Sequence, residues 1–469
     1  MRLDGGVNPI ESVLAHARQH PDTLAIASAD FTMPYGELEQ SVLRFAARLR
    51  QLGIGKGSVV AVSAHPAIEA VVTLALLHEG AVSLAGTPAV LRAYADSLDL
   101  LVTDTQLHIA VRTITVDTEF LAGLGAVSID IAPAQLQGSD VCRIVFSSGT
   151  TGTPKGVEFT VAALLARTEA AHTNWMPAEP FMCLLGLDTV SGIQTFYWSV
   201  FHGRTYFVTS TGQRNREVIE RYGVRSIKTS PARLADLVDA GEGPRLAAVQ
   251  VAGSLLTPSL GERTERVLGQ RPIYLYGSTE VGTVTSGVFD AERPHVVGRR
   301  IPEVDVELVD ATGTPITAPD IEGQVRYRSA VMVDHYWLAE GDPTSAFRDG
   351  WFYPGDLGLL SPDGELHLVG RSNDVVNANG AKYNLAELDI WLAELRIFAD
   401  AASFSYATPD GTAVGIAFVA KPHVGAEIAL AQLGARFPNL AVSTLLKLDA
   451  IPRNQLGKVD RRALASLSP

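Results

Sequence analysis

The amino-acid sequence predicts an α/β fold: a large N-terminal domain of doubly wound sheets with a small barrel-like section, then a small mobile α+β C-terminal domain. Three observations support this prediction. Short β-branched runs alternate with longer amphipathic stretches through residues 1–280, and frequent turns replace that alternation over residues 304–368. A chain of 469 residues also exceeds the size at which one hydrophobic core stops growing, which predicts at least two domains.

Five apolar runs have the composition of buried strands, and their alternation with helical segments favours mostly parallel sheets. Residues 38–52 form one such helical segment, since their apolar side chains recur at three-to-four spacing. Turn residues at 310–313 and 362–364 separate the later strands, which predicts antiparallel pairing there. The five apolar runs are 59–62, 100–102, 144–146, 206–208 and 248–251.

Composition argues against several classes of function. The formal net charge is -13, whereas a nucleic-acid-binding protein needs a basic surface to neutralise phosphates. The most apolar segment, residues 67–77, is interrupted by Glu69 and is too short to span a bilayer. The N-terminal residues lack the apolar stretch of a signal peptide, and Cys142 and Cys183 lie in apolar runs, as buried thiols do. We therefore expect a cytoplasmic protein with no nucleic-acid or membrane partner.

Residues 147–156 follow a predicted buried strand and form a loop of hydroxyl side chains and glycines. Backbone N–H groups freed by glycine can surround a polyphosphate together with Ser and Thr hydroxyls, and Lys155 adds a positive charge. The loop is not a Walker loop, because Pro154 precedes the lysine and Gly156 follows it. The alternative is a flexible surface turn. The expected nucleotide-binding residues of this loop are Ser147, Ser148, Gly149, Thr150, Thr151, Gly152 and Lys155.

This loop resembles the signature of the adenylate-forming superfamily, which comprises acyl-CoA and aryl-CoA synthetases, adenylation domains of nonribosomal peptide synthetases and luciferase-type enzymes. Further segments resemble motifs of that family in the family's order, so the likeness extends from about residue 10 to residue 465. These segments are 35–38, 276–280, 351–356, 370–374 and 452–459.

The resemblance implies a function and a domain organisation. It implies ATP-dependent activation of a small carboxylic acid to an acyl-adenylate with release of pyrophosphate. The acyl group would then pass to a thiol, either coenzyme A or the phosphopantetheine arm of a separate carrier protein. The N-terminal domain would cover residues 1–371 and the C-terminal lid domain residues 372–469, with the hinge at Asn373. The alternative is a non-catalytic nucleotide-binding homologue that senses or scaffolds.

Adenylation brings a carboxylate to a phosphate, so the site has to supply positive charge and fixed donors. By resemblance, Glu280 ligates Mg²⁺ and Thr279 binds the α-phosphate. Lys458 would reach from the small domain into the cleft, where one ammonium bridges the substrate carboxylate and the α-phosphate. We expect these three residues to form the catalytic set.

Asp356 is suited to accept hydrogen bonds from both ribose hydroxyls, and Arg371 would contact ribose or phosphate. Tyr276 offers a ring face for adenine. The other expected nucleotide contacts are Gly277 and Ser278 beside the tyrosine, and Gly253, Ser254 and Leu255 on the opposite face of adenine.

Three positions depart from the family's pattern. The hinge residue, usually Asp or Lys, is Asn373, which tolerates unusual backbone angles. Tyr274 stands where the family commonly has an Asn or an acid that reads the adenine amine. Asn377 replaces a lysine that often follows the hinge. None of these changes removes a proposed catalytic group.

The segment 184–192 lies where the family places the acid pocket, and Asp188, Ser191 and Gly192 are the expected pocket residues. A carboxylate in an apolar pocket is costly unless it has a partner, so a cationic or hydrogen-bonding substrate group would give Asp188 a purpose. The alternative is that Asp188 caps the helix that follows. Our hypothesis is a small or medium-sized acid with a polar substituent, such as an amino group.

Overall fold

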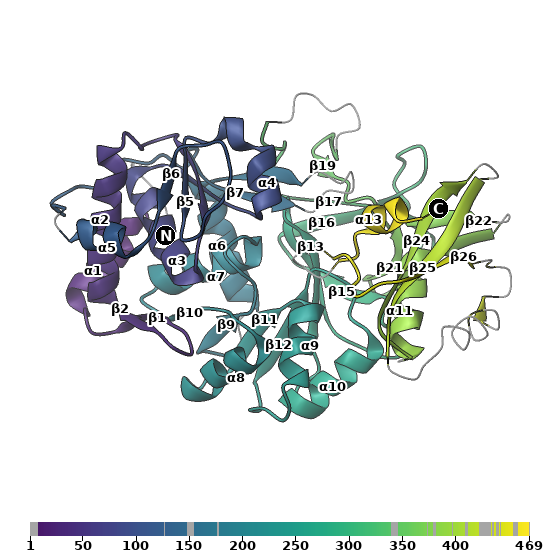
Figure 1. Ribbon diagram of the computed structural model, residues 1–469. Coiled ribbons are helices and arrows are strands. Elements are labelled where there is room, and N and C mark those ends of the chain that lie inside the picture. The colour runs from purple at the N-terminus through teal and green to yellow at the C-terminus, as the bar shows by residue number, and fades with distance from the viewer. Residues whose placement is uncertain are drawn as a thin grey trace.

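The described part of the chain forms five sheets and the helices that cover them (Figure 1). The computed structural model describes residues 8–125, 127–147, 154–175, 178–338, 346–372, 374–378, 381–395, 397–408, 411–421, 433, 436–437, 440, 442–453 and 458–468. The predicted α/β fold class is confirmed, and no described helix has both the length and the apolar character that a membrane crossing needs.

The first large sheet has the strand order β6-β5-β3-β4-β7-β8, and every pair is parallel except β7 with β8. Helices α1 (Ile10–Gln19), α2 (Tyr35–Gln51) and α3 (Pro66–Glu79) contribute to its core. The predicted helix at 38–52 is therefore confirmed as α2. The strands are β3 (Val59–Ser63), β4 (Val82–Ala85), β5 (Leu100–Thr103), β6 (Thr113–Thr115), β7 (Val141–Ser147) and β8 (Lys155–Thr160).

The second large sheet begins with four parallel strands and continues without a break into antiparallel strands. The section expected to be barrel-like thus extends the same sheet. Its parallel strands are β9 (Phe181–Cys183), β11 (Ser226–Thr229), β12 (Ala248–Ala252) and β13 (Ile273–Ser278). Its antiparallel strands are β14 (Gly282–Val288), β15 (Val296–Arg300), β16 (Val304–Val309), β17 (Gly323–Ser329), β18 (Phe347–Arg348), β19 (Trp351–Phe352), β20 (Asp356–Leu360) and β21 (Glu365–Arg371).

The apolar run at 206–208 forms β10 (Tyr206–Phe207), but this strand lies outside both large sheets. It pairs in parallel with β1 (Leu24–Ala27), which pairs antiparallel with β2 (Thr32–Pro34). The connections of the N-terminal part also include the helices α4 (Pro88–Ala93), η1 (Ala95–Ser97), α5 (Thr118–Leu124), α6 (Val161–Trp175) and α10 (Pro258–Leu268).

The two faces of the second sheet have different neighbours. Helices α8 (Gly212–Arg221) and α9 (Pro231–Asp239) share a core with Met182, Ile227 and Val249 on one face, and Figure 1 shows both helices on the same side of the sheet. Helix α7 (Val190–Phe201) lies on the other face, because its Thr195 reaches the thiol of Cys183 on β9. Helix α7 also joins the core of the first sheet, so it lies between the two sheets.

The C-terminal part has hydrophobic clusters of its own, separate from those of the large sheets. Its three-stranded sheet has the order β24-β25-β26, beside a hairpin of β22 and β23. Glu394 of this part accepts a hydrogen bond from the Ser259 backbone N–H at 3.1 Å, which connects it to the body. The elements are β22 (Val375–Ala378), β23 (Ala381–Asn384), α11 (Leu385–Leu395), β24 (Phe398–Thr408), β25 (Gly411–Ala420), β26 (Val442–Lys447) and α13 (Arg461–Ser466).

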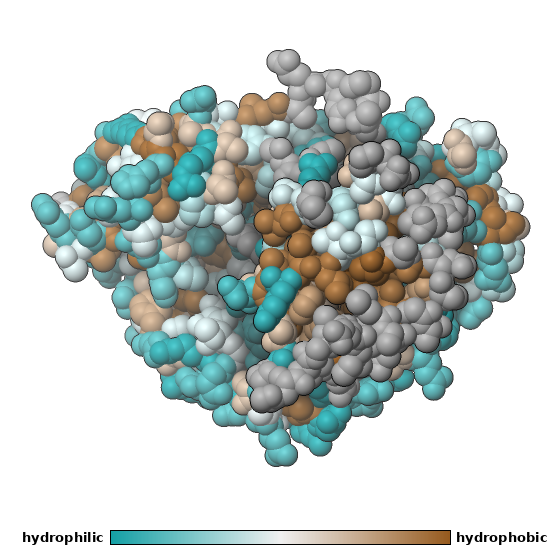
Figure 2. Space-filling model, turned by 45° about the vertical axis from the view of Figure 1, so that its right-hand side comes forward, coloured by the Kyte–Doolittle hydropathy of each residue, from teal (hydrophilic) through white to brown (hydrophobic). Residues whose placement is uncertain are grey.

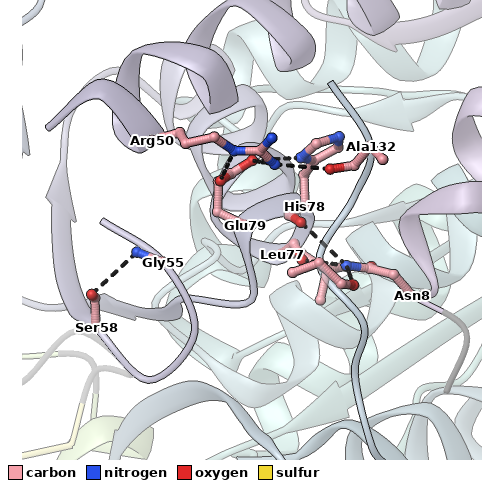
Figure 3. Close-up of polar contacts among 9 residues, drawn as sticks. Asn8, Arg50, Gly55, Ser58, Leu77, His78, Glu79 and Ala132 are labelled. Carbon is pink, nitrogen blue, oxygen red and sulfur yellow. Dashed lines mark hydrogen bonds and ion pairs between the residues drawn. The ribbon is translucent and has the colours of Figure 1, made fainter. Parts of the chain in front are cut away.

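A polar cluster joins α2 to α3, with Arg50 exposed and His78 and Glu79 buried (Figure 3). Arg50 makes a bidentate ion pair with Glu79, with N–O distances of 2.8 and 2.9 Å, and also donates to the Ala132 carbonyl. His78 Nδ1 lies 2.8 Å from Glu79 Oε1, and Asn8 donates to the Leu77 carbonyl at 2.8 Å. These bonds fix the N-terminal segment against the helices that cover the first sheet.

Candidate active site

Asp356 is the first residue of β20 and is held from two sides. Tyr276, near the end of β13, donates a hydrogen bond from Oη to Asp356 Oδ2 at 2.6 Å. Arg371, the last residue of β21, lies opposite Asp356 in the strand register, with Nε 3.2 Å from Oδ1. Burial alone lowers the pKa of Arg371, but the carboxylates of Asp356 and Asp374 hold it above its ordinary value. The structure therefore brings three predicted nucleotide-binding residues into one contact group.

Glu280 follows β13 and is 5% exposed. Tyr336 donates a hydrogen bond from Oη to Glu280 Oε1 at 2.9 Å, and the Lys155 ammonium lies 4.7 Å from the centre of the Tyr336 ring. The next residue, Trp337, donates its backbone N–H to the Gly156 carbonyl at 2.8 Å. The segment at 336–337 thus connects the lysine of the predicted phosphate loop with the predicted magnesium ligand. The sequence analysis did not identify Tyr336, and no local pattern distinguishes it.

Arg167 on α6 contacts the backbone of Thr279, the residue before Glu280. Its Nη2 donates to the Thr279 carbonyl at 3.0 Å, and its guanidinium carbon lies 4.8 Å from the centre of the Phe159 ring. Burial lowers the pKa of Arg167 to about 10, and the charge of Glu280 opposes that shift. Its Nε and Nη1 are enclosed without a hydrogen-bond partner. Sequence reasoning missed this residue, although a single arginine in the otherwise apolar start of α6 was a usable signal.

Lys458 lies within electrostatic reach of the residues described above. Burial lowers the pKa of Lys458 to about 8 and the Arg371 guanidinium adds to that shift, whereas Asp356 and Glu280 oppose it. Lys458 and Glu280 therefore share one electrostatic environment, although they lie 178 positions apart in the sequence. The structure brings Lys458 within electrostatic reach of Glu280, Asp356 and Arg371.

The turn after β12 has a defined geometry. Gly253 has a φ of 100°, a backbone conformation that residues with a side chain rarely adopt. The Ser254 carbonyl accepts a hydrogen bond from Tyr274 Oη at 3.2 Å. The tyrosine that departs from the family's pattern therefore anchors the turn at 253–255, which was predicted to face adenine. Leu255 is half-buried beside it.

The predicted phosphate loop is described only at its two ends. Ser147 ends β7 and Lys155 begins β8, and the two residues are register partners. Ser148, Gly149, Thr150, Thr151 and Gly152 lie outside the described residues, as does the predicted hinge Asn373. Of the other predicted residues, Gly277 has no room for a side chain, since an added Cβ would lie 2.0 Å from the Gly282 carbonyl oxygen. Ser278 Oγ accepts from the Val281 backbone N–H at 3.2 Å.

The predicted acid-pocket residues lie at the N-terminus of α7. The alternative that Asp188 caps this helix is wrong, because Thr189 is the N-cap and accepts from the Gly192 backbone N–H at 3.0 Å. Gly192 packs so closely that an added Cβ would lie 1.9 Å from the Gly186 carbonyl oxygen. Ser191 accepts a hydrogen bond at its carbonyl from Thr195. Asp188 is thus not needed to begin the helix.

Asp188 belongs to a buried group of charges. Burial raises its pKa, while the Arg143 guanidinium opposes that shift. Glu69 lies beside the same guanidinium, with Oε1 3.9 Å from Arg143 Nη2, and burial raises the pKa of Glu69 to about 7. Arg143 is fully buried. Arg143 therefore lies near two carboxyl groups, those of Asp188 and Glu69.

On the face drawn in Figure 2, apolar side chains gather towards the centre and polar side chains dominate the periphery. Among the described residues, no group of three or more His, Cys, Asp or Glu side chains is arranged to hold a metal ion. Any metal near Glu280 would need ligands that the described side chains do not supply.

Known proteins resemble this chain over most of its length. A family model described as AMP-binding enzyme matches residues 13–337. The chain is 27% identical to 4-coumarate--CoA ligase-like 9 of Oryza sativa subsp. japonica, in an alignment that covers 98% of this chain and 92% of that protein. It is also 27% identical to the medium/long-chain-fatty-acid--[acyl-carrier-protein] ligase FadD10 of Mycobacterium tuberculosis, with coverage of 97% and 95%.

Two solved structures have the same fold over nearly the whole chain. One is o-succinylbenzoate CoA synthetase (MenE) from Bacillus subtilis in complex with its acyl-adenylate intermediate, with a TM-score of 0.85, 22% identity and 97% coverage of both chains. The other is ATP-bound MatB from Rhodopseudomonas palustris, with a TM-score of 0.83, 20% identity and 98% coverage of both chains.

Proposed function

Because this chain belongs to the family of AMP-binding enzymes, the AMP-forming acid–thiol ligases, we propose that it activates a carboxylic acid with ATP and transfers the acyl group to a thiol. One observation carries the proposal: Lys458 shares its electrostatic environment with Glu280, Asp356 and Arg371. These four residues come from distant parts of the chain, and together they suit a reaction between two anions.

In the first step a carboxylate oxygen of the acid attacks the α-phosphorus of ATP. The new bond is a mixed anhydride, and the bond between the α-phosphorus and the oxygen bridging to the β-phosphorus breaks to release pyrophosphate. Asp356 would accept hydrogen bonds from the ribose hydroxyls, since Tyr276 and Arg371 fix its orientation. Fixed orientation matters because a bound nucleotide reacts only in a narrow range of geometries.

Lys458 would bridge the attacking carboxylate and the α-phosphate. Its ammonium reduces the repulsion between the two anions and stabilises the charge that develops in the transition state. The lowered pKa of Lys458 suits this role, because an ammonium that is poorly solvated in the free enzyme gains most from two anionic partners. Lys155 would contribute a second positive charge at the phosphates.

The residues present fit Mg²⁺ bound jointly with the nucleotide. Glu280 offers a carboxylate, the ligand type that Mg²⁺ prefers, and Tyr336 orients it through Oε1. The described side chains form no complete metal cage, which is the pattern expected when phosphate oxygens and water supply the other ligands. When bound, the ion neutralises phosphate charge.

In the second step the thiol loses its proton to solvent and its sulfur attacks the acyl carbon. The bond between that carbon and the phosphate oxygen breaks, and AMP leaves. The thiol would belong to coenzyme A or to a carrier protein's phosphopantetheine arm. Lys458 lies in the C-terminal part and Glu280 in the body, so rotation of residues 372–469 near Asn373 would withdraw the lysine after adenylation. This alternation is part of the proposal.

ATP–pyrophosphate exchange over a panel of carboxylic acids tests the proposal. We expect exchange with at least one acid, and a loss of about 100-fold in Lys458→Ala, because one transition-state donor is typically worth that much. Lys447→Ala, on the exposed side of β26, is the matched control and should leave exchange unchanged. ATP binding without exchange for any acid would instead identify a non-catalytic nucleotide-binding homologue.

The proposal also extends to the acid substrate. Asp188 lies at the N-terminus of α7 and does not serve as its cap, and its carboxylate belongs to a buried charge group with Arg143. We propose that it contacts a polar substituent, such as an amino or hydroxyl group, on a small or medium-sized acid.

A further inference from the structure

Arg167 connects the core of the first large sheet with the turn that carries Glu280. It lies on α6, whose Leu164 and Leu165 belong to the core of the first sheet. Its Nη2 donates a hydrogen bond to the Thr279 carbonyl at 3.0 Å, and Thr279 lies in the turn between β13 and β14 of the second sheet. A side chain anchored in one layer of the molecule therefore holds the backbone of the other layer.

The turn between β13 and β14 is short, and Arg167 packs against it at a second point. Ser278 and Gly282 are register partners on either side of the turn, and Ser278 Oγ accepts from the Val281 backbone N–H at 3.2 Å. Gly282 has a φ of 103°, and a Cβ added there would lie 3.1 Å from Arg167 Nη2. The guanidinium thus contacts both Thr279 and the residue that closes the turn.

The Arg167 guanidinium is enclosed by protein. The residue is 4% exposed, and within the described part of the chain its Nε and Nη1 are enclosed without a hydrogen-bond partner. Its guanidinium carbon lies 4.8 Å from the centre of the Phe159 ring on β8, and the charge of Glu280 is within electrostatic reach. A buried charge with so few partners costs free energy, and an apolar side chain would cost less. Stability alone therefore does not account for an arginine at this position.

We propose that Arg167 is a positioning residue for the magnesium-bound nucleotide, because it fixes the Thr279–Glu280 turn relative to Lys155. The proposal rests on the proposed function and adds a residue that acts on its nucleotide site from behind. Lys155 begins β8 in the first sheet and Glu280 follows β13 in the second, so a nucleotide whose phosphates use both residues lies across the two sheets. Arg167 spans the same two sheets through Phe159 and Thr279.

Isothermal titration calorimetry of ATP binding at a series of Mg²⁺ concentrations tests the proposal without an acid and without turnover. Arg167→Met removes the hydrogen bond and the charge. We expect the Kd for ATP at saturating Mg²⁺ and the Mg²⁺ concentration for half-maximal binding each to rise about tenfold, the usual loss when a group that orients a metal ligand is removed. Arg167→Lys keeps the charge and a donor, so both quantities should stay within about threefold of the wild type.

Arg216→Met is the matched control. Arg216 on α8 is also 4% exposed, its Nε and Nη1 are also enclosed without a partner, and it donates to the carbonyls of Leu237 and Gly241. Arg216→Met should lower the midpoint of urea unfolding, as Arg167→Met should, and keep the wild-type affinity for ATP and Mg²⁺. If both variants lose stability and both keep the wild-type affinity, Arg167 is a structural residue and the inference is wrong.

Arg167→Gln decides the question if Arg167→Met does not fold. Glutamine keeps a donor but is shorter and uncharged, and ATP with bound Mg²⁺ carries a net negative charge, so we expect the Kd to rise at least about threefold. Wild-type affinity in Arg167→Gln would then overturn the inference.

The same measurements separate this inference from the proposed function. Absence of ATP–pyrophosphate exchange with every acid, together with weaker nucleotide binding in Arg167→Met, contradicts the proposed function and supports the positioning role. Exchange with an acid, together with unchanged nucleotide binding in Arg167→Met, contradicts the positioning role alone.

Discussion

Tyr276 Oη lies 2.6 Å from Asp356 Oδ2, and this hydrogen bond spans 80 positions of sequence. It joins the last parallel strand of the second sheet to the antiparallel strand β20. Burial and the neighbouring carboxylate raise the pKa of Tyr276 well above its ordinary value, so the hydroxyl stays protonated and donates. The carboxylate of Asp356 is therefore oriented before any nucleotide binds.

Tyr276→Phe removes this hydrogen bond and keeps the aromatic ring. We expect the KM for ATP to rise about tenfold, since one hydrogen bond to a charged group contributes about 1.5 kcal/mol, and kcat to change less. Steady-state ATP–pyrophosphate exchange measures both constants.

The matched control is Tyr406→Phe in the C-terminal sheet, whose hydroxyl bonds Thr444. That variant should keep the wild-type KM for ATP. A Tyr276→Phe enzyme with an unchanged KM would show that Arg371 alone positions Asp356.

We expect kcat/KM for adenylation to decline above about pH 8, because Lys458 loses its proton there. Its pKa is lowered to about 8, so the ammonium is present below that pH and is lost as the pH rises through it. The proposed bridge between carboxylate and phosphate needs the charged form, so kcat/KM should fall about tenfold per pH unit on the alkaline side. A pH profile of the exchange reaction measures this decline.

Lys458→Arg provides the control for this decline, because a guanidinium stays charged over the whole range. The variant should lose absolute rate, since its geometry differs, but its profile should stay flat where the wild-type rate declines. A wild-type profile that remains level up to pH 10 would contradict the assignment.

The sequence allowed prediction of the charged residues of the site but not of the residues that orient them. Glu280, Asp356 and Lys458 stand in contiguous motifs, so each was visible locally. Arg167 contacts the Thr279 carbonyl across 112 positions, and Tyr336 contacts Glu280 across 56. Such pairings exist only after the sheets have formed, so the sequence could at most single out Arg167 as an arginine in an apolar helix start, without its partner.

The sequence pattern predicted that the apolar runs form strands. It did not predict which sheet each strand joins, because pairing between distant segments decides that. The runs at 59–62 and 248–251 became central strands of the two large sheets. The run at 206–208 has the same composition, yet it pairs with β1 in a small separate sheet. At the start of α7 the cap is Thr189 and not Asp188, because either residue type can cap and only the backbone conformation decides.

Glu280→Gln should raise the Mg²⁺ concentration for half-maximal adenylation about 100-fold, because a neutral amide is a weaker ligand than a carboxylate. Tyr336→Phe should raise it about tenfold, since it removes the hydrogen bond that orients the carboxylate. Titration of free Mg²⁺ at fixed ATP measures both shifts. Glu262→Gln, exposed on α10, should leave the curve unchanged; a Glu280→Gln curve that overlays the wild type would exclude this metal ligand.

Glu79→Gln should destabilise the protein by about 2 kcal/mol, because it breaks a charge-assisted bidentate contact with Arg50. Burial alone raises the pKa of Glu79, but His78 and Arg50 bring it below the ordinary value. The stabilisation is therefore present above the pKa of the unfolded chain and is lost as the pH falls through the folded pKa. Urea unfolding at pH 7 and pH 4 measures the effect, and the two proteins should differ less at the lower pH.

We expect Asp188 to make the enzyme prefer acids that carry a polar substituent. Burial raises the pKa of Asp188, and the guanidinium groups of Arg143 and Arg233 oppose that shift. Asp188→Ala should lower kcat/KM about tenfold or more for amino- and hydroxy-substituted acids and much less for the unsubstituted parents, since only the former lose a charged hydrogen-bond partner.

The measurement is ATP–pyrophosphate exchange with pairs of acids that differ only in that substituent. Thr189→Ala is the informative control, because it removes the helix cap and leaves the carboxylate in place. We expect it to lower stability and to retain the preference among acids. If Asp188→Ala keeps the wild-type preference across every pair, then Asp188 serves only to balance the charge of Arg143, and the acid is selected by other residues of the pocket.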